Sequence, residues 1–298
     1  MRIIKDTFDN VVNNSIVTKV NDTMAESKAY SRRLYKITSM ILFVTLVILF
    51  SVFYIFDFIL IMYFIMIGLF LLILGIVYLV RHFQERKQIL YGVVYPHAIK
   101  TYNTSYETAF TYEEKPEKDP KINQEMGLFT RYASVSHKYR IDGQIEDVPV
   151  SMMHMRLVTS NGKSASVHFD GEYTVVEIKG LETSQIRNAG RPALKKVSFK
   201  RIKTAEDKVY ILKTSDNEHP PAILRKTYDK LKSTFKAKYY YVASNEQALH
   251  FAFWPKERIT LPKDLSLNLL NQTIKRIQVM HYQKVMLAKE IIDNNKTL

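Results

Sequence analysis

The sequence predicts a membrane protein, with a two-helix transmembrane hairpin and a cytoplasmic α+β domain that has a mainly antiparallel sheet and a long C-terminal helix. The first observation behind this prediction is a run of 44 residues, 37–80, without Lys, Arg, His or Glu. The second is an alternation of apolar and polar residues over 129–178, which is typical of β-strands. The third is an apolar stripe of helical period over 265–293, which indicates an amphipathic helix.

The apolar run is long enough for two membrane crossings. A hydrocarbon core about 30 Å thick needs about 20 helical residues, so 37–56 and 58–80 each suit one crossing, with Asp57 between them. Both crossings are expected to be helices, because no water satisfies backbone groups within lipid. A carboxylate is costly at bilayer depth and tolerated at the interface, which favours a solvated turn at Asp57 over a functional acid.

Basic residues flank the run and are absent from it. Seven Lys and Arg residues precede residue 37, and Arg81, Arg86 and Lys87 follow the second predicted span. Because Lys and Arg favour the cytoplasmic side, we expect a two-span cell-membrane protein with cytoplasmic N- and C-termini. The chain has 43 basic and 29 acidic residues, and a basic domain at the inner face is attracted to anionic lipid.

Two segments flank the predicted hairpin. Residues 1–36 read as an amphipathic helical arm that lies on the membrane or packs on protein, and its modest positive charge favours packing on protein. Residues 81–127 are predicted to continue the second helix as far as Pro96, which disrupts it. They then form a polar loop over 112–123.

Residues 128–262 are predicted to form the α+β domain. Asp142-Gly143 and Asn161-Gly162 each follow an alternating run and predict two-residue hairpin turns. The break at Asp170-Gly171-Glu172 is either a third hairpin or a glycine bulge inside one long strand.

The rest of the domain is predicted to contain two more strand pairs and a helix. The strands are expected at 197–202 and 208–213, and at 235–243 and 248–254. A helix follows Pro220-Pro221 and ends near Ser233. Residues 263–298 form the C-terminal amphipathic helix, whose apolar stripe Lys284 interrupts. Helices 1–36 and 265–293 are candidate surfaces for a protein partner or a second copy of this chain.

These features resemble the bacterial domain-of-unknown-function family number 3137 over most of residues 30–255. The resemblance rests on the double apolar span, the charged helix that follows it, the strand VHFDGEY at 167–173, and a later β-α-β-β segment. Its motifs are an aromatic-x-Gly core within a strand and a spacing of elements. The resemblance implies a membrane-anchored architecture without an assigned activity, and it favours the bulge interpretation of Gly171.

Residues 183–203 form the most basic stretch of the chain. A solvated loop leading into a strand is the favoured interpretation. The alternative is a site for anionic lipid or nucleic acid, of which nucleic acid is disfavoured. The candidate ligand-binding residues are Arg187, Arg191, Lys195, Lys196, Lys200 and Arg201.

Catalytic and metal-binding signatures are weak. The chain has no cysteine, which excludes disulfides, thiol nucleophiles and Cys-ligated zinc. His154, His168 and Asp170 are candidates for a metal site if they converge within the sheet, but an ordinary sheet is the favoured interpretation. No phosphate-binding loop, nucleophile elbow or His-Glu-x-x-His helix is present, and no cofactor is expected.

The leading hypothesis is a non-enzymatic protein whose cytoplasmic α+β domain acts as a binding or scaffold module at the inner face of the membrane. The alternatives are a membrane-tethered enzyme or metal-binding domain, and a domain that binds anionic lipid or nucleic acid through 187–203.

Overall fold

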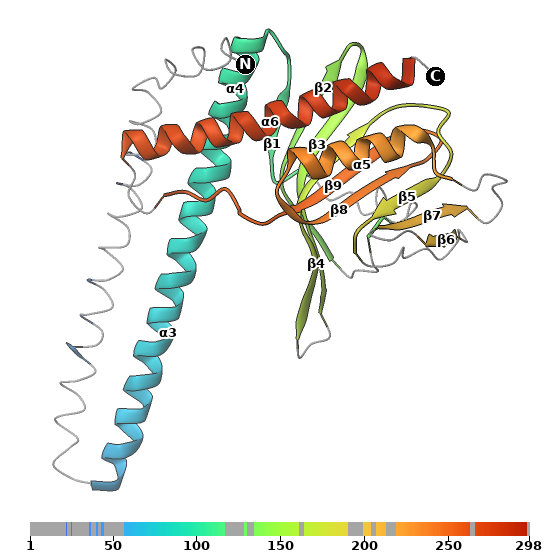
Figure 1. Ribbon diagram of the computed structural model, residues 1–298. Coiled ribbons are helices and arrows are strands. Elements are labelled where there is room, and N and C mark those ends of the chain that lie inside the picture. The colour runs from blue at the N-terminus through green and yellow to red at the C-terminus, as the bar shows by residue number, and fades with distance from the viewer. Residues whose placement is uncertain are drawn as a thin grey trace. The chain divides into compact units, whose positions relative to one another are not determined.

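The computed structural model describes most of the chain from residue 57 onward. The described ranges are 57–116, 128–129, 134–160, 164–189, 199–203, 207–212, 219–262 and 266–296, with single positions among 22–44. Two compact units are present: a helical unit with the described residues of 57–94 and 261–271, and an α+β unit with those of 95–260 and 272–296 (Figure 1). The predicted arm 1–36 and the first predicted span, 37–56, lie outside the described residues except for those single positions.

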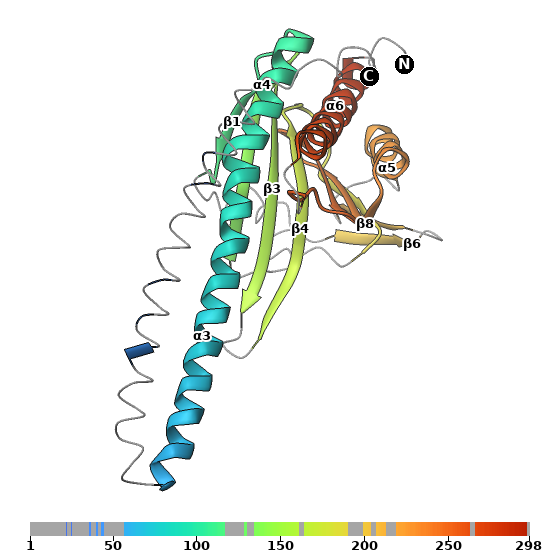
Figure 2. The same cartoon turned by 90° about the vertical axis from the view of Figure 1, so that its left-hand side faces the viewer.

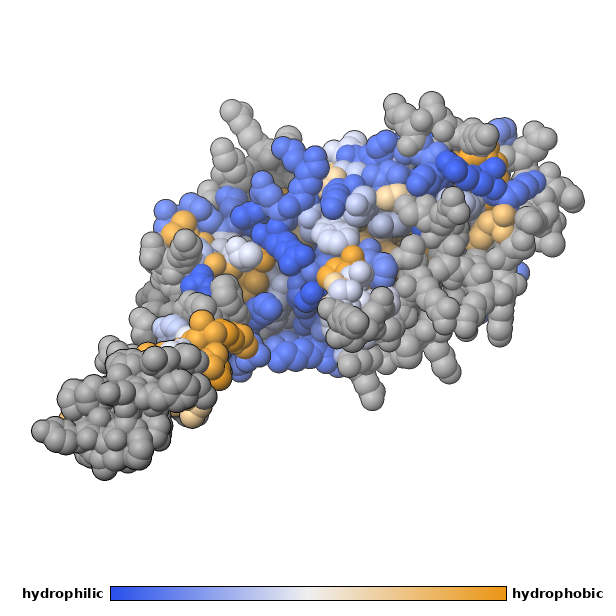
Figure 3. All heavy atoms as spheres, turned by 90° about the horizontal axis from the view of Figure 1, so that it is seen from below, coloured by the Kyte–Doolittle hydropathy of each residue, from blue (hydrophilic) through white to orange (hydrophobic). Residues whose placement is uncertain are grey.

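The helical unit consists mainly of one long helix. α3 covers Asp57–Ile89, and the π-helix η1, Leu90–Val94, follows it. The guanidinium of Arg86 donates hydrogen bonds to the carbonyl oxygens of Leu261 and Pro262, at 2.7 and 2.6 Å. Hydrophobic side chains gather on this unit in Figure 3. Over the described part of the chain, none of the helices combines the length and the apolar character that a membrane crossing requires.

Pro96 does not end the helical segment, contrary to prediction. α4, Tyr95–Tyr106, begins directly after η1, and Pro96 is its second residue. A proline is tolerated in the first turn of a helix, because the N–H that it lacks would have no helical partner there. The chain therefore changes from α-helix to π-helix over Leu90–Val94, and a new α-helix begins at Tyr95, one residue before the proline.

The described residues of the α+β unit contain one sheet of nine strands, in which every neighbouring pair is antiparallel. Its spatial order is β1-β2-β3-β4-β9-β8-β5-β7-β6. The strands are β1 Thr111–Glu114, β2 Ser134–Ile145, β3 Val148–Ser160, β4 Ala165–Val176, β5 Ser184–Arg187, β6 Phe199–Lys203, β7 Lys208–Leu212, β8 Ala237–Ser244 and β9 Leu249–Pro255. Among the described residues, this unit also contains α5, Ala222–Thr234, and most of α6, Leu267–Lys296, of which residues 272–296 belong to it.

The two faces of the sheet are covered differently. α5 and α6 lie on one face (Figures 1 and 2), and α4 packs on α6 through Tyr102, whose ring meets His281 edge-on at 4.5 Å. The opposite face carries an apolar cluster in which Phe129 packs on Phe169 and Tyr241, with ring centroids 4.5 and 5.4 Å apart. The mainly antiparallel sheet and the long C-terminal helix are therefore confirmed.

The first predicted hairpin turn lies elsewhere. β2 continues through Asp142-Gly143, and the chain turns at Glu146-Asp147, between the paired residues Ile145 and Val148. Glu146 and Asp147 have φ angles of 50° and 66°, as a two-residue type I′ turn requires. Gly143 serves close packing instead, since a Cβ there would overlap the ring of Phe110.

The break at Asp170-Gly171 is neither a hairpin nor a bulge. β4 pairs with β3 without interruption from Phe169 to Val176, and the register shift falls beside His168. The glycine is needed because β9 comes close at this point. A Cβ at position 171 would overlap the carbonyl oxygen of Phe253 and lie 3.0 Å from Cα of Trp254.

The remaining strand predictions have mixed outcomes. The pairs β6–β7 and β8–β9 and helix α5 are confirmed. β3 and β4 are paired on either side of 161–163, so the hairpin connection is confirmed, although Asn161-Gly162 lies outside the described residues. The predicted loop at 112–123 is wrong at its start, because 111–114 pairs with β2 as an edge strand.

The close approach at Gly171 leads to a stability prediction. Gly171→Ala should destabilise the α+β unit by about 1–3 kcal/mol, because the added methyl group overpacks against backbone atoms that cannot rotate away. Urea denaturation of the full chain, followed by near-ultraviolet circular dichroism, measures the change. Gly75→Ala is the matched control, because nothing lies within 4 Å of a Cβ at that position of α3. Equal denaturation midpoints for the two variants would contradict the assignment.

Candidate functional site

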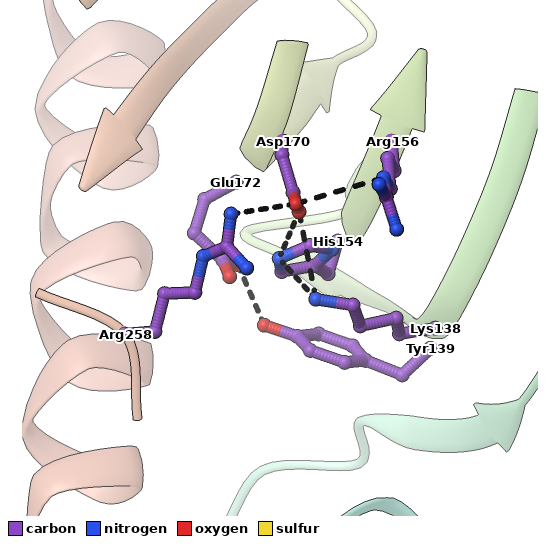
Figure 4. A network of polar contacts seen from close by, with 7 residues as sticks. All are labelled: Lys138, Tyr139, His154, Arg156, Asp170, Glu172 and Arg258. Carbon is purple, nitrogen blue, oxygen red and sulfur yellow. Dashed lines mark hydrogen bonds and ion pairs between the residues drawn. The ribbon is translucent and has the colours of Figure 1, made fainter. Parts of the chain in front are cut away.

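A bulge in β2 directs two neighbouring side chains toward the helix-covered face. The β2–β3 register shifts between His137 and Tyr139, so Lys138 and Tyr139 together oppose His154 on β3. A bulge places two residues opposite one and bends the strand locally. The side chains of Lys138 and Tyr139 consequently both reach polar residues of the neighbouring strands, His154 on β3 and Glu172 on β4 (Figure 4).

Asp170 is the centre of this polar network. Its carboxylate is almost fully buried, and Oδ2 accepts a hydrogen bond of 2.7 Å from Nη2 of Arg258. Arg156 on β3 approaches the same oxygen through Nε at 3.8 Å. Lys138 Nζ and His154 Nε2 lie 3.5 and 3.4 Å from Oδ1. Three basic side chains and an imidazole thus surround one carboxylate.

Glu172, two residues further along β4, forms a second buried centre. Its Oε2 accepts hydrogen bonds from Nζ of Lys284 at 2.9 Å and from the hydroxyl of Tyr139 at 2.6 Å. Lys284 has no exposed side-chain surface, although it lies on α6, and it sits 5.7 Å from the centroid of the Tyr139 ring. Burial alone would raise the pKa of Glu172, but Lys284, His154 and the Tyr139 hydrogen bond together lower it.

His154 is held neutral by its surroundings. Burial lowers its pKa to about 4, and Glu172 opposes this shift only in part. Nε2 lies 3.1 Å from Nζ of Lys138, so the neutral ring is suited to accept a hydrogen bond from that ammonium group. Burial also lowers the pKa of Lys138, and the nearby Arg258 acts in the same direction.

The structure brings together two of the three metal candidates. His154 and Asp170 are neighbours, whereas His168 lies at the β4 bulge and pairs with the hydroxyl of Thr159 at 2.9 Å. Among the described residues, no group of three or more His, Asp or Glu side chains is arranged to hold a metal ion. The positions around Asp170 that further ligands would need are taken by cations.

The anion-binding candidates are dispersed. Arg187 is buried in β5, where its guanidinium donates to the carbonyl oxygen of Leu128 at 2.7 Å and lies over the rings of Tyr210 and Tyr241. Lys200 and Arg201 lie on the edge strand β6. The other three candidates, Arg191, Lys195 and Lys196, lie outside the described residues.

Sequence reasoning missed the basic members of the network, although signals for some were present. Arg156 is two residues after His154, so the two side chains share a strand face. Lys284 interrupts the apolar stripe of its helix, which is the signature of a buried charge with a partner elsewhere. Nothing local indicates Arg258, which lies in the irregular segment after β9.

The comparisons with known proteins add little. No protein family and no curated protein matches the sequence. Among solved structures, the mycobacterial trehalose monomycolate transport factor A, TtfA, aligns at 14% sequence identity with a TM-score of 0.31, over 64% of this chain and 94% of that chain. A likeness at that level supports no argument about fold or function.

The buried pair Lys284–Glu172 leads to a second prediction. Lys284→Met should destabilise the α+β unit by about 3–5 kcal/mol, because it leaves an uncompensated buried carboxylate. Adding Glu172→Gln should recover much of the loss, and a double-mutant cycle by urea denaturation measures the coupling. Lys289→Met on the same helix removes only an exposed pair with Glu146 and should have a much smaller effect. Additive losses at 172 and 284 would contradict the pairing.

Buried histidines lead to a pH prediction. His154 has a folded pKa of about 4 against an ordinary 6.5, so the unfolded chain binds more protons between these values. Stability should therefore be full above pH 6.5 and fall as the pH decreases toward 4, by roughly 3 kcal/mol for this residue. His154→Gln should make the dependence measured by urea denaturation from pH 7.5 to 4.5 shallower, and His250 and His281, whose pKa values burial also lowers, should supply the part that remains. The exposed His219→Gln should leave it unchanged, and a slope identical in all three proteins would refute the assignment.

Proposed function

We propose that this protein is anchored in the cell membrane by a helical hairpin and presents its α+β unit as a binding module at the cytoplasmic face. The observation that carries the proposal is the run 37–80, which lacks Lys, Arg, His and Glu. A run of this length and composition is costly to leave in water and suits two crossings of a bilayer. The proposal rests on the run as a whole, part of which lies outside the described residues.

The described part of the run supports this proposal. Between residues 66 and 80 of α3, most large apolar side chains are exposed, among them Met66, Leu72, Ile73 and Ile76, each more than half accessible. Soluble proteins rarely leave contiguous apolar patches uncovered. A lipid environment would cover these side chains without requiring a protein partner.

The distribution of charge supports the proposed orientation. Basic residues occur before residue 37 and again from Arg81 onward, and the segment between them has Asp57 as its sole ionisable acid. The positive-inside rule then assigns both ends of the hairpin to the cytoplasm. Membership of the bacterial family number 3137 would agree with this arrangement and is part of the proposal.

The state of the buried acids favours binding over catalysis. A general base must be able to take up a proton near neutral pH. Glu172 is stabilised as an anion by Lys284 and Tyr139, and Asp170 is engaged by Arg258 and its neighbours. These carboxylates hold other groups in place, as expected of a binding surface rather than a reactive centre.

Cysteine labelling tests the topology, because the chain has no cysteine of its own. Single substitutions Ser27→Cys, Asp57→Cys and Glu113→Cys should be introduced and treated with a membrane-impermeant thiol reagent. In intact cells, only the Asp57→Cys protein should react, whereas all three should react once the membrane is permeabilised. Glu113 suits this purpose because it is exposed on the edge strand β1.

Two results would overturn the proposal. Labelling of the Glu113→Cys protein in intact cells would place the α+β unit outside the cytoplasm. Recovery of the protein in the soluble fraction, without detergent, would remove the membrane anchor itself.

A further inference from the structure

The polar network around Asp170 and Glu172 has more positive than negative formal charge. Four basic side chains, Lys138, Arg156, Arg258 and Lys284, meet the two carboxylates, while His154 is neutral near pH 7. Because Lys284 and Glu172 offset one another, the surplus of two charges belongs to the cluster around Asp170. We refer to Lys138, Arg156 and Arg258 as the cationic cluster.

The surplus lies on side chains that reach solvent. Arg258 and Arg156 keep 51% and 46% of their side-chain surface exposed, whereas Asp170 keeps 3%. Within the described chain, the ion pairs of both arginines are made with Asp170. A guanidinium has five N–H donors, and a single carboxylate oxygen leaves several of them available to a ligand.

Asp170 also arranges the two arginines. Both guanidinium groups approach the same oxygen, Oδ2: Arg258 from the segment after β9 at 2.7 Å, and Arg156 from β3 at 3.8 Å (Figure 4). Two cations within this distance repel each other, and one buried carboxylate offsets only one of them. An anion that bridges their outer N–H groups would relieve the remaining repulsion.

We propose that the cationic cluster binds a phosphate group, with Arg156 and Arg258 as the contacting residues and Asp170 as their positioning residue. A phosphate dianion matches the surplus of two charges, and its oxygens can accept parallel hydrogen bonds from the planar fork of each arginine. The phosphate could belong to a lipid headgroup or to a soluble phosphorylated molecule. Its chemistry at the site is the same in both cases.

The assignment rests on the proposed function in one respect, since it names the ligand class of the proposed binding module. The two are nevertheless tested separately. Cysteine labelling reports only topology, and phosphate binding to the purified chain requires no membrane orientation. If labelling shows a different topology, the proposed phosphate site is unaffected. If phosphate does not bind, the proposed topology is unaffected.

Isothermal titration of inorganic phosphate into the full chain in detergent, at constant ionic strength, tests the site. We expect saturable binding that Arg156→Gln and Arg258→Gln each weaken at least about tenfold, as is usual for a charge-assisted hydrogen bond. Arg156→Lys and Arg258→Lys should weaken it less, because they keep the charge and lose the fork. Arg276→Gln, which removes an exposed arginine paired with Glu257, is the matched control and should bind normally.

Nanodiscs distinguish the source of the phosphate. If nanodiscs containing phosphatidic acid reduce the binding of inorganic phosphate and nanodiscs of phosphatidylcholine alone do not, the ligand is a lipid headgroup. If neither reduces it, the ligand is soluble. Circular dichroism checks that each variant is folded, and the lysine variants remain informative if a glutamine variant is not. No saturable binding up to about 10 mM phosphate, or binding that is equal in the arginine variants and the control, would overturn the proposal.

Discussion

The helix-covered face of the sheet depends on the buried ion pair between Lys284 and Glu172. It joins α6 to β4 across a distance of 112 residues in the chain, with both side chains withdrawn from water. Removing two charges from water costs several kcal/mol for each ion. The attraction between the ions offsets this desolvation cost only when the other hydrogen-bonding positions of the two charged groups are also filled. The Tyr139 hydroxyl fills one of them. The pair therefore constrains where α6 can lie and which way the bulged part of β2 must face.

The two faces of the sheet differ in chemistry, because the buried ion pair lies on one of them and an apolar cluster on the other. On one face, Phe129, Phe169 and Tyr241 form an apolar cluster that needs no specific partner geometry. On the other, Asp170 and Glu172 point toward helices and must be compensated group by group. Because β4 alternates, a single strand supplies both environments. This arrangement buries Asp170 beneath two arginines, Arg156 and Arg258, whose side chains remain about half exposed.

Glycine roles were the least accessible part of the fold. Asp142-Gly143 has the composition of a hairpin turn, yet Gly143 accommodates Phe110 and the turn falls at Glu146-Asp147. Gly171 has the composition of a break, yet it admits the backbone of β9. Local composition reports which backbone angles are permitted, but it does not report which neighbour will approach. Each error therefore arose where packing from a distant segment decided the role of the residue.

The sequence by itself determined the antiparallel character of the sheet, helix α5 and the amphipathic C-terminal helix. These elements follow from the spacing of apolar residues and from turn residues between strands, which are local features of the sequence. It also marked Lys284 as an anomaly in an apolar stripe. Only the tertiary structure decided that Lys284 meets Glu172, that Arg258 meets Asp170, and that His168 stands apart from His154. Asp170 and Arg258 are 88 residues apart. Which residues meet at such separations depends on the strand register, on the bulge at Lys138 and on the course of the chain after β9. The periodicity of the sequence does not reveal any of these three features.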